Sequence, residues 1–240
     1  MLAIMNKQDL LTKSIKVLDK KFPPAADPVA RPVLEEVLYA VVREGTTTEQ
    51  ANAVFAKMKG TFFDWNEVRV STVPEIADAI AGVPDASRKA QRINEILHYV
   101  FEMYYSFELT DLDKKGLKQA GKQLGRFTGM TDFGVAWVIQ RALGGHAIPL
   151  DEPTIRALRR LGIIEGEGEV EDLEAVRTSL EHYIPKSSGP TFTDRFSTLA
   201  VTICQEKPKC PDCPLRPDCP TGQEYGKKVA PEPKPKPKSR

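Results

Sequence analysis

The sequence predicts an all-α fold with two lobes. Apolar residues recur at helical spacing through most of the 240-residue chain, and no segment shows a β-hairpin pattern or an internal repeat. A chain of this length can bury a full core or be divided between two helical units. Its 34 basic and 33 acidic residues nearly cancel, so any surface that attracts a polyanion must be local.

Helices are expected first in the N-terminal half. The clearest one follows Pro32, a residue suited to a first helical turn, and its apolar stripe comprises Val33, Leu34, Val37, Leu38, Val41 and Val42. Further amphipathic segments lie at 51–58, 76–80, 93–104 and 117–124. These segments predict a bundle of short helices.

The C-terminal half adds a strongly apolar segment at 133–139 and a sharply bounded helix. That helix begins after Asp151, which suits an N-cap before Glu152 and Pro153, and it ends before Gly162. Helices expected around 170–180 and 192–203 lead into a group of cysteines.

No apolar run approaches the roughly 20 residues that span a bilayer. Lys and Asp residues interrupt the N-terminal segment too often for a signal peptide. We therefore expect a soluble cytoplasmic protein without a membrane partner. The clustering of all the cysteines in one short segment suits a reducing compartment.

Four cysteines, Cys204, Cys210, Cys213 and Cys219, are separated by five, two and five residues. This spacing lets four thiolates converge on one metal centre, and four thiolates are what a [4Fe–4S] cluster requires. A zinc site usually pairs two separated C-x-x-C knuckles, whereas one such pair occurs here. Zinc and a small disulfide knot remain the alternatives to an iron–sulfur cluster.

A tight turn lies between two predicted helices at 124–136. A helix–hairpin–helix element uses glycines in such a turn to bring backbone amides close to phosphate oxygens. Gly129 fits the first glycine of that element, whereas Thr131 occupies the second glycine position. The alternative is an ordinary turn between two core helices.

The order of hairpin, Asp151-capped helix and C-terminal cysteine loop resembles the helix–hairpin–helix DNA glycosylase superfamily, in its endonuclease III branch. The resemblance extends from about Val33 to Cys219. It implies a two-lobed fold with a [4Fe–4S] cluster, double-stranded DNA as partner, and base-excision repair as function. It also implies DNA contacts by five hairpin residues, Thr128, Gly129, Met130, Thr131 and Gly134.

Three departures from the family pattern bear on activity. The first gap of the cysteine loop is five residues where the family has six. Glu44 stands where a glutamine is typical. Phe133 occupies the position of the lysine that attacks the sugar in bifunctional members, and a phenylalanine cannot perform that reaction. The resemblance places Glu44 and Phe133 in the base pocket.

Asp151 is the candidate catalytic residue by the same resemblance. Removal of a base builds positive charge on the sugar, and a fixed carboxylate stabilises that charge. The alternative is that Asp151 is only an N-cap, and both roles are compatible. We expect a monofunctional N-glycosylase without lyase activity; the alternative is a catalytically inactive DNA-binding or damage-sensing protein.

We expect three segments along the chain. Residues 26–140 form a helical bundle domain that includes the hairpin, and residues 1–25 with 141–222 form a cluster-bearing helical domain. Residues 223–240 form a disordered Lys- and Pro-rich tail. We expect a monomer associated with the nucleoid.

Overall fold

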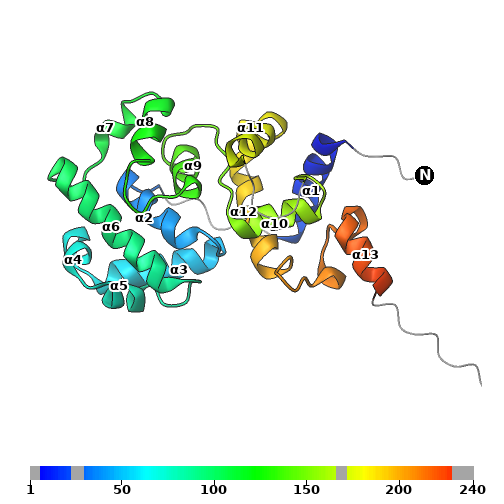
Figure 1. Cartoon of the computed structure of the whole chain (residues 1–240), viewed down its shortest axis with the longest axis horizontal. Coiled ribbons are helices and arrows are strands. Elements are labelled where there is room, and N and C mark those ends of the chain that lie inside the picture. The colour runs from blue at the N-terminus through cyan, green and yellow to red at the C-terminus, as the bar shows by residue number, and fades with distance from the viewer. Residues whose placement is uncertain (1–5, 23–29, 166–171, 229–240) are drawn as a thin grey trace, which may run out of the picture.

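The computed structural model describes residues 6–22, 30–165 and 172–228. In these ranges the regular structure is helical, apart from one isolated bridge between Ala81 and Val83. The helices gather into two groups, which meet where α9 packs against α12, as Figure 1 shows. The prediction of a two-lobed all-α fold is therefore confirmed.

The first lobe is a bundle of eight helices around one apolar core (Figure 1). They are α2 (Val33–Arg43), α3 (Thr48–Thr61), α4 (Trp65–Val70), α5 (Val73–Ala79), α6 (Ala86–Tyr104), α7 (Thr110–Asp113), α8 (Leu117–Leu124) and α9 (Asp132–Arg141). Helix α2 lies at the centre of the bundle and packs against α3, α6 and α9. The nearly continuous apolar sequence of α2 matches this position, because a helix surrounded by others has no polar face.

The second lobe combines the N-terminal helix with the C-terminal ones. It contains α1 (Lys7–Lys21), α10 (Glu152–Arg160), α11 (Leu173–Tyr183), α12 (Gly189–Thr202) and α13 (Pro220–Lys228), with three short 3-10 turns. Helix α12 packs against both α1 and α10, and its Phe192 and Phe196 are fully buried. The partly buried Cys204, Cys213 and Cys219 pack against this second core.

The C-terminal end differs from the expected tail. Residues 223–228 belong to α13, so helix replaces the disorder expected there. The first turn of α13 is fixed because the Gln223 backbone N–H donates to the Cys219 carbonyl over 3.0 Å. Residues 229–240 of the predicted tail lie outside the described part of the chain.

A buried arginine joins the two lobes. Arg43, the last residue of α2, is 0% exposed, and its guanidinium donates to the Thr46 carbonyl and to the Ser197 hydroxyl of α12. Its Nε also donates to Thr48 Oγ1 over 3.3 Å. Burial lowers the pKa of Arg43 from its usual value, and nearby carboxylates oppose that shift.

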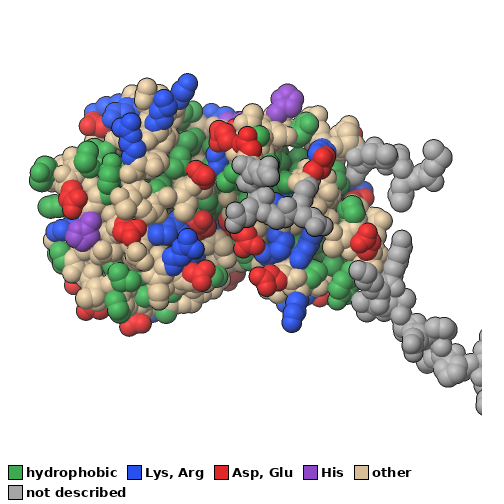
Figure 2. Space-filling model, in the orientation of Figure 1, with side chains coloured by type: hydrophobic (Ala, Val, Ile, Leu, Met, Phe, Trp, Pro, Cys, Tyr) green, Lys and Arg blue, Asp and Glu red, His purple; other side chains and the backbone are tan. Residues whose placement is uncertain are grey.

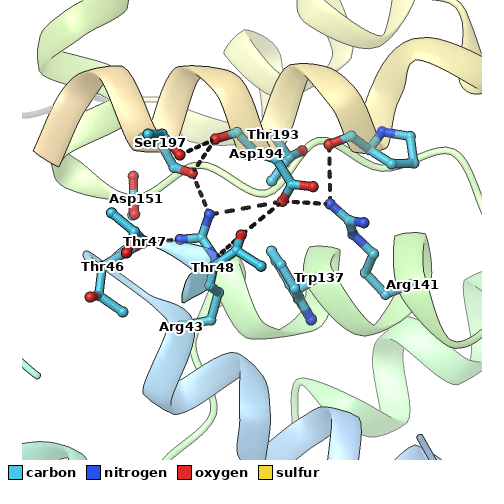
Figure 3. Close-up of polar contacts among 12 residues, drawn as sticks. Arg43, Thr46, Thr47, Thr48, Trp137, Arg141, Asp151, Thr193, Asp194 and Ser197 are labelled. Carbon is cyan, nitrogen blue, oxygen red and sulfur yellow. Dashed lines mark hydrogen bonds and ion pairs between the residues drawn. The ribbon is translucent and has the colours of Figure 1, made fainter. Parts of the chain in front are cut away.

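Asp194 of α12 forms ion pairs with two arginines of the first lobe. Its Oδ1 lies 2.9 Å from Arg141 Nη2 of α9 and 3.9 Å from Arg43 Nη2 (Figure 3). The Arg141 guanidinium also donates to the Pro190 carbonyl. The guanidinium groups of Arg43 and Arg141 thus both find partners across the lobe contact.

Candidate functional site

A cleft of about 750 Å³ opens between the lobes. Its walls come from the turn between α2 and α3, the N-terminal end of α6, the hairpin, the N-terminal end of α10 and the segment after α12. The charged residues of the walls are Glu44, Asp85, Arg88, Lys89, Arg92, Asp151, Glu152, Arg156, Glu206 and Lys207. The cleft therefore carries both signs of charge on elements from both lobes.

Asp151 lies in the wall of this cleft and is 4% exposed. Its Oδ1 accepts the Thr154 backbone N–H over 3.0 Å, so Asp151 caps α10 as predicted. Its Oδ2 accepts the Gly45 backbone N–H of the other lobe over 2.9 Å. One carboxylate thus links the lobes, and two backbone amides fix its orientation.

The turn that supplies Gly45 has a glycine for a conformational reason. Gly45 has a φ of +71°, in the left-handed region, which side chains with a Cβ adopt only with strain. A Cβ at this position would meet no atom within 4 Å. The requirement is therefore for the backbone angle that presents the N–H to Asp151, and not for space.

Glu44 lines the same cleft beside Asp151, on the turn that the resemblance assigned to the base pocket. Its Oε2 lies 2.8 Å from Arg92 Nη1 of α6 and accepts the Thr131 hydroxyl over 3.2 Å. Arg92 in turn donates to the Gly129 carbonyl over 2.8 Å and to Thr131 Oγ1 over 3.1 Å. Glu44 is therefore attached to the hairpin both directly, through Thr131, and through Arg92.

The hairpin itself has the geometry expected at its first glycine. Gly129 has a φ of +87°, and a Cβ there would approach the Arg92 carbonyl to 2.8 Å. Thr131, which occupies the second glycine position, is the N-cap of α9. Its hydroxyl accepts the Gly134 N–H over 3.2 Å. No acceptor is found within the described ranges for the backbone N–H groups of Thr131 and Asp132.

The other predicted hairpin residues occupy different surroundings. Thr128 is exposed and Met130 is half-buried, whereas Gly134 is buried. The Met130 N–H donates to the Phe127 carbonyl, and Gly134 packs against Met130, whose sulfur would lie 2.9 Å from a Cβ. The exposed part of the predicted DNA contact is therefore the turn itself, before α9 begins.

Phe133 does not lie where the resemblance placed it. It is 3% exposed in the first core, stacked on Trp137 with ring centroids 5.8 Å apart, and it does not line the cleft. The structure therefore separates Phe133 from Glu44, against the expectation of a shared base pocket. The reason is that an aromatic ring at this position of α9 gains more from the apolar core than from the polar cleft.

Lys89 of α6 is a lysine of the cleft wall that the sequence did not single out. It is 5% exposed, and its ammonium donates to the carbonyls of Val42, over 3.0 Å, and Glu44. Burial lowers the pKa of Lys89 to about 8, although the Glu44 carboxylate acts against the shift. Lys89 therefore secures the C-terminal end of α2 with a cation, where the helix dipole favours one.

A local basic surface lies on α7, α8 and the loops beside them. Figure 2 shows several Lys and Arg side chains over the part of the first lobe that contains these helices in Figure 1. The exposed basic residues of this segment are Lys114, Lys115, Lys118, Lys122 and Arg126. They precede the hairpin turn along the chain, and Lys122 and Arg126 are the nearest of them in sequence to its free backbone amides.

The four cysteines surround a small cavity of about 20 Å³ in the second lobe. All four are free thiols in the structure, so no disulfide joins them. Burial raises the pKa of Cys210 and Cys213, and that of Cys219 to about 11. Within the described ranges, no group of three or more His, Cys, Asp or Glu side chains is arranged to hold a single metal ion.

Basic groups and a backbone amide face the cysteine cavity. Arg160 of α10 donates to Cys204 Sγ over 3.5 Å and to the Glu206 carbonyl over 3.0 Å, and Arg216 also lines the cavity. The Gly222 N–H donates to Cys219 Sγ over 3.4 Å. Donors and cations of this kind favour the ionised form of thiols, which is the form that binds a metal centre.

Sequence reasoning missed the partners that organise the cleft, namely Arg43, Gly45, Lys89 and Arg92. A signal existed for two of them. Lys89 lies four residues before Ile93 on the apolar stripe of α6, and Arg43 directly continues the apolar run of α2. A charged residue on an apolar stripe must find a buried partner, which is what both do.

No model of a protein family matches the sequence, and no curated protein matches it. Solved structures do match. A non-covalent endonuclease III–DNA complex has a TM-score of 0.69 at 21% identity, over 93% of this chain and 100% of that chain. A thermostable thymine-DNA glycosylase has a TM-score of 0.64 at 16% identity, over 91% and 97%.

A third similar structure is the 3-methyladenine DNA glycosylase of H. pylori bound to 1,N6-ethenoadenine. It has a TM-score of 0.52 at 14% identity, over 82% of this chain and 94% of that chain. Within the described residues, no helix is both long and apolar enough to cross a membrane. The chain thus has the two-lobed, all-α helix–hairpin–helix fold of endonuclease III and related DNA glycosylases.

Proposed function

We propose that this protein removes damaged or mismatched bases from double-stranded DNA as a monofunctional N-glycosylase. One observation carries the proposal: Asp151 lies in the wall of the cleft between the lobes, fixed by amides from both of them. The similar structures include glycosylases and complexes with DNA, which supports the same substrate here. The exposed lysines before the hairpin and the free amides of its turn would hold the phosphate backbone.

In this proposal the target base leaves the stack and enters the cleft. As the bond between base and sugar breaks, positive charge develops on the sugar, and the Asp151 carboxylate stabilises it. A water molecule then adds to the sugar carbon, and the base leaves with a proton. The oriented carboxylate needs no reorganisation during this step because two N–H groups already hold it.

The absence of lyase activity belongs to the same proposal. Phe133 occupies the start of α9, and its ring is buried in the core. Lys89 lies in the cleft wall, but its ammonium is engaged with two backbone carbonyls. We therefore expect no covalent intermediate between a lysine and the sugar, so borohydride should trap no protein on abasic DNA.

We further propose that Cys204, Cys210, Cys213 and Cys219 hold a [4Fe–4S] cluster. Such a cluster would supply four iron–thiolate bonds that tie the segment after α12 to α13. Arg160 would connect that segment to α10, the helix that Asp151 caps. Iron and sulfide analysis with visible absorption spectroscopy of the purified protein tests this; a zinc-loaded, colourless protein would contradict it.

The activity is tested by incubating the protein with duplexes that carry damaged or mismatched bases, followed by alkali to cleave abasic sites. We expect base release by the natural protein and a loss of roughly 100-fold or more in Asp151→Asn, because a neutral amide does not stabilise the cationic sugar. Asp172→Asn is the matched control. Asp172 also caps a helix, α11, through the Ala175 N–H, but it does not line the cleft.

A non-catalytic DNA-binding or damage-sensing protein is the second candidate. The observation that favours it is that both oxygens of Asp151 already accept backbone N–H groups. Salt-dependent binding to duplex DNA without base release from any substrate would select this function. Base release that Asp151→Asn leaves unchanged would instead remove Asp151 from the mechanism.

A further inference from the structure

Glu44 lines the cleft, and protein donors reach one of its two carboxylate oxygens. Oε2 receives both Arg92 Nη1, over 2.8 Å, and the Thr131 hydroxyl, over 3.2 Å. No donor to Oε1 is found in the part of the chain that the structure describes. The side chain of Glu44 is 23% exposed and lines the cleft, so Oε1 is available to a molecule that enters it.

Protein contacts hold the other carboxylate oxygen of Glu44, its backbone carbonyl and the next residue. Arg92, which holds Oε2, is itself 13% exposed and held by the Gly129 carbonyl of the hairpin. The backbone carbonyl of Glu44 accepts the buried ammonium of Lys89. The next residue, Gly45, holds Asp151. An acceptor is therefore fixed one residue from the group that orients the candidate catalytic carboxylate.

The described residues that line the rest of the cleft are mostly polar or charged. None of the described residues that line it is aromatic, so no ring is placed there to stack on an extruded base. An ionised carboxylate has acceptors and no donor, so it binds an N–H group and disfavours a carbonyl oxygen in the same place. The described lining of the cleft therefore offers hydrogen-bonding groups, and no aromatic ring, for the recognition of a base.

We propose that Glu44 Oε1 determines specificity by accepting a hydrogen bond from an exocyclic amino group of the extruded base. The preferred substrates are then bases that keep this amino group, over counterparts that carry a carbonyl oxygen at the same ring position. This inference rests on the proposed glycosylase function and names its substrate class. Arg92 and Thr131 act as positioning residues, because they hold the other oxygen of the carboxylate.

Matched pairs of substrates test the proposal. One pair is 5-hydroxycytosine and 5-hydroxyuracil, and the second is adenine and hypoxanthine, each placed opposite guanine in the same duplex sequence. The members of a pair carry either an amino group or a carbonyl oxygen at the same ring position. The ring nitrogen beside that position is an acceptor in the amino member and an N–H donor in the carbonyl member. We expect the amino member to be released roughly 10- to 100-fold faster in single turnover, as for one hydrogen bond to a charged group.

Glu44→Gln is the informative variant because its amide has nearly the same shape and can either donate or accept. It should move the ratio of the two rates in each pair toward one. Glu152→Gln is the matched control: Glu152 lines the same cleft, but its side chain is 84% exposed and pairs with Arg156. This control should leave the ratio unchanged. A ratio of rates does not depend on the fraction of folded protein.

The outcomes separate the inference from the proposed function. Equal release of both members, faster release of the carbonyl member, or a ratio that Glu44→Gln leaves unchanged would overturn the role of Glu44. Base release in those cases would still support a glycosylase. A failure to release any base from any duplex would overturn both.

Discussion

The turn after α2 has two faces that differ in their exposure to water. On one face, Arg43 is fully buried and reaches Ser197 and Asp194 of the second lobe. On the other face, Glu44 and Gly45 border the cleft, where Gly45 holds Asp151. Consecutive residues thus join the lobes on one side and furnish the candidate site on the other.

The difference between the two faces shows why charged groups can bind a ligand at the cleft and not at the buried contact. At the buried contact, the guanidinium and carboxylate are paired within the protein, since unpaired charges there would carry a large desolvation cost. At the cleft, Glu44 and Asp151 are held in part by protein donors and line the cavity. The buried face therefore fixes the position of one lobe against the other, and the cleft face provides the carboxylates of the candidate site.

The largest effect is expected from Arg43→Ala. This change removes the cation at the lobe contact and leaves the Ser197 hydroxyl and the Thr46 carbonyl without their donor. We expect the free energy of unfolding to fall by about 3–5 kcal/mol, as when one partner of a buried charge pair is removed. Urea denaturation followed by circular dichroism measures this loss.

Arg126→Ala serves as the control for that change. Arg126 is an exposed arginine of the hairpin, so its replacement should alter the free energy of unfolding by no more than about 0.5 kcal/mol. A loss below about 1 kcal/mol for Arg43→Ala would mean that the buried contact does not hold the lobes together.

A smaller effect, dependent on pH, is expected from Lys89→Met. Burial lowers the pKa of Lys89 to about 8 from 10.5, so between these values the unfolded chain binds more protons than the folded one. The natural protein should therefore gain stability as the pH rises through this window, by up to about 3 kcal/mol. The variant lacks this contribution.

The measurement is the difference in unfolding free energy between the two proteins at several pH values from 8 to 10.5. Taking the difference removes the titration of groups that both proteins share. A difference that stays constant with pH would show that the Lys89 ammonium is not desolvated, and the cleft wall at α6 would then be open to water.

The smallest effect is expected from Gly45→Ala. Its φ of +71° makes an alanine strained, although the added Cβ meets no neighbour, so we expect a loss of about 1–2 kcal/mol. Gly60→Ala in α3 is a control of opposite sign: Gly60 also has open space, and alanine favours a helix by up to about 1 kcal/mol. Thermal unfolding of both variants compares them.

Equal behaviour of the two alanine variants would mean that the turn at Gly45 relaxes without cost. The backbone conformation of Gly45 would then not be what orients Asp151. The cleft face of the turn would differ from the buried face only in its side chains.

Much of the fold could be predicted from local patterns. The apolar stripe of α2, the cap at Asp151 and the glycine of the hairpin turn each depend on residues close in sequence, and the structure has all three. Phe133 shows where this reasoning ends. A family position suggested a pocket, but the packing of α9 placed the ring against Trp137 in the core.

The sequence by itself determined most of the helices, the cap at Asp151, the turn at Gly129 and the spacing of the four cysteines. These features depend on backbone preferences and on neighbours within a few residues. Only the tertiary structure decided that Glu44, Arg92 and Thr131 meet, and that Gly45 reaches Asp151. Hydrogen bonds and ion pairs act over a few ångströms, so residues far apart along the chain become partners only after the helices have packed.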